Sequence, residues 1–119
     1  MPKKHIHPYQ TRYHAKAIYS KAIRASGDMV FMQGQVGVDD NGDLVGKGDP
    51  GKQADQAGGE LTDVCKLTVY VTDISYRPAV YQAINKWFDG VRHCSTGVVV
   101  SSLADEDLLV EIDAIGMID

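Results

Sequence analysis

The sequence predicts a single α+β domain in which one sheet carries helices on one of its faces. Short apolar segments with strand-like alternation recur along the chain, and a long amphipathic pattern over 76–88 lies between two of them. The chain has 119 residues, within the ~100–150 residues that are common for one domain. We therefore assign 1–119 to one domain and treat 1–17 as an N-terminal arm.

The composition excludes several classes of protein. Hydrophobic residues make up 44% and charged residues 24%, which is typical of a globular chain rather than a disordered one. The net charge of −4 argues against a dedicated nucleic-acid binder, but it leaves room for an anionic small substrate in a local positive pocket. No apolar run approaches the ~18–20 residues of a membrane helix, and no secretory signal follows Met1. We expect a cytoplasmic protein that binds neither nucleic acid nor membrane.

The first strands are expected between residues 20 and 45. Residues 20–25 alternate weakly and a turn follows them. The apolar run at 29–32 predicts a buried strand that extends towards Val38, with Met29, Phe31 and Met32 in the core. Asn41-Gly42 predicts a hairpin turn because both positions tolerate positive φ, and a short return strand is expected at 44–45.

The clearest strand is expected at 64–71, and a helix follows it. One face of this strand would carry Val64, Lys66, Thr68 and Tyr70, and the other face would carry Cys65, Leu67, Val69 and Val71. We place Cys65 in the core. Asp73 and Ser75 offer capping oxygens for the helix. Its apolar face recurs at helical spacing and consists of Tyr76, Val80, Ile84, Trp87 and Phe88. Gly90 is expected to end it.

Two further strands are expected near the C-terminus. Residues 96–100 are β-branched apart from Gly97. Residues 109–115 alternate cleanly, with Val110, Ile112 and Ala114 on one face. Glu111 and Asp113 share the other face, about 6.6 Å apart along the strand.

One part of the chain does not fit this arrangement. A crossover between parallel strands usually needs a dozen or more residues, mostly helical. Between Val45 and Val64 the only helix-forming material is the short stretch 53–57, which Gly58-Gly59 follows at once. Either the topology differs, or a helix is deleted between Ala57 and Gly58; we favour the deletion.

Two places could carry chemistry. Just before a strand, reactive or hydrogen-bonding side chains follow one another: Arg92, His93, Cys94, Ser95 and Thr96. This stretch is either a site or a plain loop, and Cys94 would be activated only as a thiolate. Glu111 and Asp113 form either a pair of working carboxylates or the polar face of an edge or interface strand.

Metal and cofactor motifs are weak in this sequence. His5 and His7 could make half of a metal site, but a solvated arm is the stronger interpretation. The sequence contains no glycine-rich phosphate loop, nucleophile elbow or paired-cysteine zinc motif. We therefore expect no metal and no cofactor.

Several segments taken in order resemble the Rid family, the reactive intermediate deaminases, also called YjgF-type or L-PSP endoribonuclease-like proteins. The resemblance covers roughly residues 12–119. The segments that carry it read YSKAIR at 19–24, VFMQGQVGV at 30–38, DVCKLTVYVTD at 63–73, SSLA at 101–104 and LVEIDAI at 109–115. Each segment alone is modest, but their order along the chain is specific.

The resemblance implies a fold, an assembly and an activity. The implied fold is chorismate-mutase-like, and the implied assembly is a homotrimer whose sheets form a central barrel with three clefts between subunits. Family members hydrolyse imines and enamines such as 2-aminoacrylate to a keto acid and ammonia, without a cofactor. The resemblance also implies a long helix after Gln53 to Ala57, which supports the deletion.

The resemblance assigns site residues one by one. Glu111 matches the water-activating glutamate, and Tyr19 and Gly34 match residues that line the cleft. An arginine that grips the substrate carboxylate is also implied. Counting back from Leu103 puts Ser95 at its position, and a slip of one residue puts Cys94 there, so neither alignment gives arginine. Arg92, Arg24 or Lys66 are the alternative cations, and Cys94 or His93 could define a different chemistry.

The function predicted from these observations is hydrolysis of a small carboxylated imine, resembling 2-aminoacrylate or 2-aminomuconate, at a subunit-interface cleft. The proposed site comprises Glu111 as the catalytic residue and six substrate-binding residues: Tyr19, Gly34, Arg92, His93, Cys94 and Ser95. The partners expected are two further copies of the chain and a small carboxylated metabolite. A trimer that binds a metabolite without turnover is the alternative, and an endoribonuclease is a weaker one.

Overall fold

The computed structural model describes residues 3–7, 20–49, 64–89 and 93–118. Its elements in chain order are β1 (Lys3–His7), β2 (Ala22–Ser26), β3 (Asp28–Val36), β4 (Val64–Val71), the 3-10 turn η2 (Ile74–Tyr76), α2 (Arg77–Trp87), β5 (Cys94–Val99) and β6 (Val110–Ile118). Part of the expected N-terminal arm is therefore the strand β1. The deletion expected between Ala57 and Gly58 lies outside the described residues.

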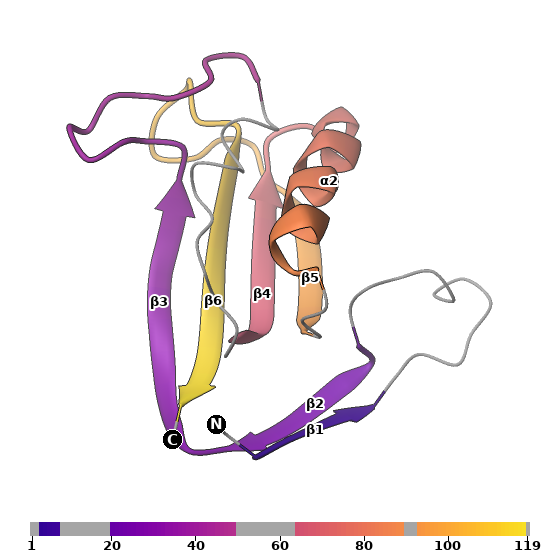
Figure 1. Cartoon of the computed structure of the whole chain (residues 1–119). Coiled ribbons are helices and arrows are strands. Elements are labelled where there is room, and N and C mark those ends of the chain that lie inside the picture. The colour runs from indigo at the N-terminus through magenta and orange to yellow at the C-terminus, as the bar shows by residue number, and fades with distance from the viewer. Residues whose placement is uncertain (1–2, 8–19, 50–63, 90–92, 119) are drawn as a thin grey trace.

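The main sheet has four strands in the order β3-β6-β4-β5. Strand β6 pairs antiparallel with β3 and with β4, and β4 pairs parallel with β5. The helix α2 connects the two parallel strands and lies over one face of the sheet (Figure 1). Strands β1 and β2 form a separate antiparallel ribbon at the foot of the sheet (Figure 1). The predicted α+β arrangement, a sheet with helical cover on one face, is confirmed.

The core lies between α2 and the sheet face that α2 covers. It is built from strand positions two residues apart and helix positions three or four apart, as the two periodicities require. Its members are at most 7% exposed: Val64, Leu67, Val69, Val71, Val80, Ala83, Ile84, Phe88, Val110, Ile112 and Ala114. The predicted inward positions of the helix at Val80, Ile84 and Phe88 are confirmed, and so is the alternation of β6.

The first residues of β4 depart from simple alternation. The pairing of β4 with β6 shifts between Val64 and Lys66, which marks a β-bulge. The bulge turns Val64 into the core, where it is 1% exposed, and leaves Cys65 only half-buried. The prediction that Cys65 shares the buried face of Leu67 was wrong for this reason.

Strand β3 is less buried than its composition predicts. Met29 is 52% exposed and Phe31 is 72% exposed, so their expected core positions were wrong for the single chain. The reason is that β3 is an edge strand and only one of its faces turns towards α2, which buries Met32 against the core. The return strand expected at 44–45 is also absent among the described residues, where one isolated bridge joins Val38 to Leu44.

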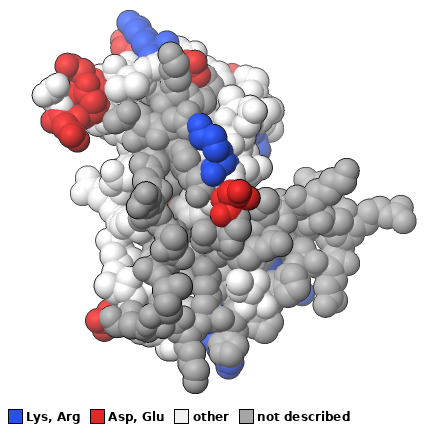
Figure 2. Space-filling model, in the orientation of Figure 1, with Lys and Arg blue, Asp and Glu red and all other residues white. Residues whose placement is uncertain are grey.

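A turn forms at Asn41-Gly42, where the Gly42 N–H donates to the Asp39 carbonyl at 2.9 Å, but of these two residues only Gly42 has positive φ. Gly42 has φ +83°, which a residue with a Cβ adopts only at a cost. The Asp39 side chain accepts hydrogen bonds from the backbone N–H groups of Asn41 (2.9 Å) and Asp43 (3.0 Å). Acidic side chains gather over this turn at the upper left of Figure 2.

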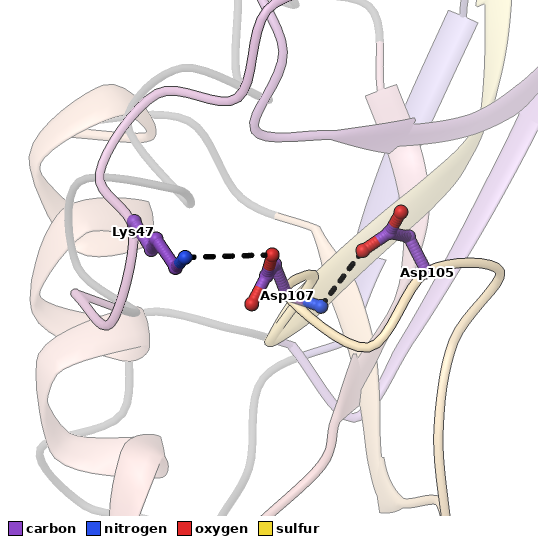
Figure 3. Close-up of polar contacts among 3 residues, drawn as sticks. All are labelled: Lys47, Asp105 and Asp107. Carbon is purple, nitrogen blue, oxygen red and sulfur yellow. Dashed lines mark hydrogen bonds and ion pairs between the residues drawn. The ribbon is translucent and has the colours of Figure 1, made fainter.

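An exposed ion pair links two loops at the same end of the sheet. Lys47 Nζ lies 3.8 Å from Asp107 Oδ2, and the Asp107 backbone N–H donates to Asp105 Oδ1 at 2.8 Å (Figure 3). Both charged side chains are largely in water, 77% and 45% exposed, so the pair contributes only ~0–1 kcal/mol. Lys47 is therefore a suitable site for a neutral control substitution.

Asp73 caps the turn that leads into α2. Its Oδ1 accepts from the backbone N–H of Ser75 at 2.8 Å and from the Ser75 hydroxyl at 2.7 Å. These two bonds favour the carboxylate and hold the pKa of Asp73 below its ordinary value of 3.8.

Asp73→Ala is expected to lower the midpoint of thermal unfolding at neutral pH. Because the folded-state pKa is depressed, this contribution is present above the ordinary pKa and is lost as the pH falls through the lowered one. The difference between wild type and variant should therefore narrow in acid, which unfolding curves at a series of pH values would measure. A difference that stays constant down to the most acid pH would contradict this role for the carboxylate.

No helix within the described parts of the chain is both long enough and apolar enough to cross a membrane.

Candidate functional site

The candidate site lies on the face of the main sheet opposite α2, which we call the open face. Strand alternation and pairing register place seven polar or thiol-bearing residues on three adjacent strands of this face: Lys66, Thr68 and Tyr70 of β4, Cys94 and Thr96 of β5, and Glu111 and Asp113 of β6. In the register, Tyr70 is opposite Glu111, Thr68 is opposite Asp113, and Lys66 is opposite Cys94. Cross-strand neighbours on one face have Cβ atoms about 5 Å apart, so these groups form one continuous polar surface.

Glu111 lies directly against the backbone of β3. The pairing of β3 with β6 shifts between Met32 and Gln35, and Gly34 lies within this irregularity. A Cβ at position 34 would lie 2.8 Å from Cδ of Glu111 and would overlap its Oε2. Glycine is therefore required here if the carboxylate is to keep its place over the strand. The structure thus brings together two residues that the sequence assigned to the site, Glu111 and Gly34.

Tyr70 and Asp113 form a hydrogen-bonded pair beside Glu111. The Tyr70 hydroxyl donates to Asp113 Oδ2 at 2.9 Å. This bond stabilises the neutral phenol, and together with partial burial and the charges of Asp113 and Glu111 it raises the pKa of Tyr70. The Tyr70 phenol consequently keeps its proton. Its hydroxyl donates to Asp113 and not to Glu111.

Lys66 lies at the other end of the polar surface. Its Nζ donates to Thr96 Oγ1 at 2.5 Å and to the Leu67 carbonyl at 3.0 Å. Partial burial lowers the pKa of this lysine, and the nearby Cys94 and Asp113 partly offset the effect.

The structure separates the predicted site residues 93–95. Arg92 lies outside the described residues, as does Tyr19. His93 is 1% exposed and its ring stacks on Phe88 with centroids 4.5 Å apart, so it is surrounded by core rather than facing the open face. Its carbonyl accepts from the Ser20 backbone N–H at 2.7 Å.

Cys94 and Ser95 point to opposite faces of the sheet. Cys94 is half-buried beside Lys66 on the open face. Ser95 pairs with Leu67, whose side chain is in the core, so Ser95 turns towards α2. Its Oγ is buried without a hydrogen-bond partner among the described residues.

Five members of the polar surface are outside the site assigned from the sequence: Lys66, Thr68, Tyr70, Thr96 and Asp113. The alternation of 64–71 already puts Tyr70 on the face of Lys66. The missing information was the strand order, because only the adjacency of β6, β4 and β5 brings Tyr70 to Asp113 and Lys66 to Thr96.

The donor set of the open face does not resemble a metal centre. Nowhere in the described parts of the chain do three His, Cys, Asp or Glu side chains converge in a way that could hold a metal ion. The chemistry that the surface offers is that of one carboxylate, one phenol–carboxylate pair, one ammonium group and one thiol.

The protein is a small α+β domain whose sheet has one face covered by a helix and one polar open face. Comparison with known proteins identifies the family to which it belongs. The family model described as Endoribonuclease L-PSP matches residues 9–118. The chain therefore belongs to the Rid/YjgF/L-PSP family, and the resemblance found in its sequence is confirmed.

Individual relatives agree with this assignment. A RutC family protein of Pyrococcus abyssi is 32% identical over 109 residues, which are 82% of this chain and 84% of that protein. The solved structure of the Rid family protein YyfB of Yersinia pestis has a TM-score of 0.85 and 26% identity, and the match covers 97% of this chain and 98% of that one. TdcF of E. coli, solved with bound serine, has a TM-score of 0.66 and 27% identity over 78% of this chain and 83% of that one.

Proposed function

We propose that the protein is a hydrolytic deaminase of small carboxylated enamines and imines, with Glu111 as the residue that activates water. The observation that carries the proposal is the position of the Glu111 carboxylate, on the open face and directly over the backbone of Gly34. Glu111 is half-buried, so its carboxylate can reach a ligand on the sheet surface. A carboxylate in such a place can orient a water molecule and take its proton.

The proposed reaction consists of proton transfers, addition of water and cleavage of the C–N bond, and it needs no oxidant or reductant. Protonation of the terminal carbon converts 2-aminoacrylate to the imine, whose C=N carbon is electrophilic. Water adds to that carbon while Glu111 accepts a proton, and the nitrogen of the resulting carbinolamine is protonated. The hydroxyl group of the carbinolamine then loses its proton, C=O forms as the C–N bond breaks, and ammonia leaves. One water is consumed, one ammonia is released, C=O replaces C=N and no electrons are transferred, so the product from 2-aminoacrylate is pyruvate.

Family membership and the solved relative with bound serine support a small amino-acid-like ligand. Serine carries an α-carboxylate and an α-nitrogen, and a 2-imino acid carries the same two groups on adjacent carbons. The fold of that relative is similar, with a TM-score of 0.66, and we propose that both proteins bind their ligand at the same position of the fold.

The proposed site is completed by self-association into a homotrimer. The open face carries exposed apolar side chains next to its polar surface: Met29 is 52% exposed, Phe31 72% and Val98 36%. Burying such side chains against a second copy would stabilise an assembly and place the polar surface at a subunit boundary. Sedimentation equilibrium should give three times the mass of one chain, and a monomer would contradict this part of the proposal.

A coupled assay tests the proposed activity against its two alternatives. A serine or threonine dehydratase generates 2-aminoacrylate or its four-carbon analogue in place, 2-aminomuconate is run in parallel, and ammonia release is followed. Faster release with the protein present is expected for at least one of these substrates. Binding of the keto acid product without any acceleration would identify a metabolite-binding trimer, which the missing arginine at Cys94 and Ser95 favours.

Ribonuclease activity is the third outcome, in view of the description of the family model. The chain carries a net charge of −4, and the described basic side chains visible in Figure 2 are separate from one another. Phosphate contacts dominate the affinity for nucleic acid, so this arrangement favours a small ligand instead. Cleavage of a single-stranded RNA at a rate above that of imine hydrolysis would overturn the proposed function.

A further inference from the structure

The ammonium group of Lys66 is held by neutral oxygen atoms. Its two hydrogen bonds go to the Thr96 hydroxyl and the Leu67 carbonyl, and neither of these groups carries a charge. Asp113 is near enough to influence the lysine, but its Oδ2 accepts from Tyr70. An ammonium group has three N–H donors, and the described residues offer Nζ two acceptors, which leaves one donor for water or a ligand.

Neither hydrogen bond of the Lys66 ammonium group goes to a negatively charged group. Partial burial removes water from the ammonium group, and neutral acceptors replace only part of the lost solvation. An anion placed against Nζ would restore the balance, because a charge-assisted hydrogen bond is stronger than a neutral one. The side chain is therefore a natural acceptor of an anionic ligand on the open face.

Along the strand direction, the Lys66 side chain leans towards the level of Glu111, while its bond to Thr96 draws it sideways towards β5, on the side of β4 opposite β6. The two acceptors of Nζ, Thr96 and Leu67, both lie further along β4 and β5 than Lys66 itself, and Thr96 is level with Thr68 in the register. Glu111 is level with Tyr70, two residues beyond Thr68. Two residues of strand correspond to about 6.6 Å along the strands, and at least one strand spacing of about 4.8 Å separates the two side chains across the sheet. A carboxylate, its neighbouring carbon and an attacking water can occupy this span.

We propose that Lys66 binds the carboxylate of the substrate and that Thr96 positions its ammonium group for this task. The inference rests on the proposed function for the nature of the substrate and deepens it by naming the anchor. It also accounts for the chain's lack of arginine at Cys94 and Ser95, since Lys66 is the register partner of Cys94. The substrate class that follows is a short acid with its reacting carbon next to the carboxylate.

Binding of pyruvate, compared with that of its uncharged analogue pyruvamide, tests the proposal. Both are titrated into the full-length protein while backbone amide resonances are followed by NMR. Lys66→Met is expected to weaken pyruvate binding about tenfold or more, the usual loss for one charge-assisted hydrogen bond. Lys66→Arg should retain most of the affinity, and pyruvamide binding should be the same in wild type and Lys66→Met.

Lys47→Met is the matched control, since it removes one lysine charge from an exposed loop at the end of the sheet. It should bind pyruvate as the wild type does. If Lys66→Met does not fold, Lys66→Gln serves in its place, because an amide keeps hydrogen-bonding capacity without the charge. Equal pyruvate affinity in wild type and Lys66→Met, an equal loss in Lys47→Met, or no binding of pyruvate to the wild type would overturn the inference.

The failure of this inference can be distinguished from the failure of the proposed function. If the wild type releases no ammonia but binds pyruvate in a way that depends on Lys66, the role of Lys66 in anion binding is supported and the deaminase activity is contradicted. Turnover that is lost in Glu111→Gln, with KM and pyruvate affinity unchanged in Lys66→Met, would leave the deaminase standing and remove the anchor. If Lys66 is the anchor, Lys66→Met should raise KM more than it lowers kcat.

Discussion

Replacing Glu111 with glutamine is expected to lower the rate of imine hydrolysis by about 10²–10⁴-fold, the usual contribution of a general base. Glutamine has nearly the shape of glutamate, so it still fits over Gly34, where a Cβ would overlap the carboxylate. It cannot accept a proton from water. The loss should therefore appear in kcat, while pyruvate affinity changes little.

Glu106→Gln is the control for this experiment, because Glu106 is exposed and lies in the loop that precedes β6. It removes the same charge and should retain full activity. The prediction fails if Glu111→Gln keeps more than about a tenth of the wild-type kcat, since a working general base contributes more than that. Folding of the variant is checked by the dispersion of its amide resonances.

Ile84→Ala is expected to lower the free energy of unfolding by about 2–5 kcal/mol. Ile84 is 1% exposed in the middle of α2 and packs against the covered face of the sheet. Truncation removes buried methyl groups and leaves a space that the rigid sheet cannot fill. The change is a large part of the stability of a small domain, which is typically 5–15 kcal/mol in total.

The neighbouring residue supplies the control for that experiment. Asn85 is exposed on the same helix, so Asn85→Ala should change the free energy of unfolding by no more than about 0.5 kcal/mol. Urea titrations at one fixed protein concentration would measure both variants, because an oligomer's stability depends on concentration. Similar effects of the two substitutions would contradict the assignment of the buried face of α2.

Local periodicity predicted the helix and the last strand well. The buried helix residues Val80, Ile84 and Phe88 recur at helical spacing, and residues 110–114 alternate between buried and partly exposed. The local spacing of apolar residues is therefore enough to predict the buried side of each segment. The bulge at Val64 and Lys66 could not be predicted in this way, because its cause is the pairing with β6 and not the pattern of β4.

Exposure on the edge strand is a second case in which pattern and structure differ. The run at 29–32 is apolar on both faces, which is typical of a strand buried on both sides. In the single chain, α2 covers only one of these faces, and Phe31 is left 72% exposed. The apolar pattern therefore predicts burial of Phe31 that the single chain does not give, and the proposed self-association would bury this side chain.

The candidate site was predictable where one strand carries it and unpredictable where several strands meet. Glu111 and Asp113 follow from the alternation of a single strand, and the resemblance adds Gly34. The bond between Tyr70 and Asp113 and the bond between Lys66 and Thr96 join residues 43 and 30 positions apart. Such contacts depend on the order β6-β4-β5, which no local pattern encodes.

The proposed activity of this chain is hydrolysis of a small carboxylated imine on the open face of its sheet. Ammonia release from 2-aminoacrylate, its four-carbon analogue and 2-aminomuconate tests this activity, with wild type and Glu111→Gln measured side by side on each substrate. Wild type should accelerate ammonia release from at least one of these substrates, and Glu111→Gln should give a rate close to the uncatalysed one. Equal rates for the two proteins on every substrate, whether both accelerate release or neither does, would contradict the proposed activity.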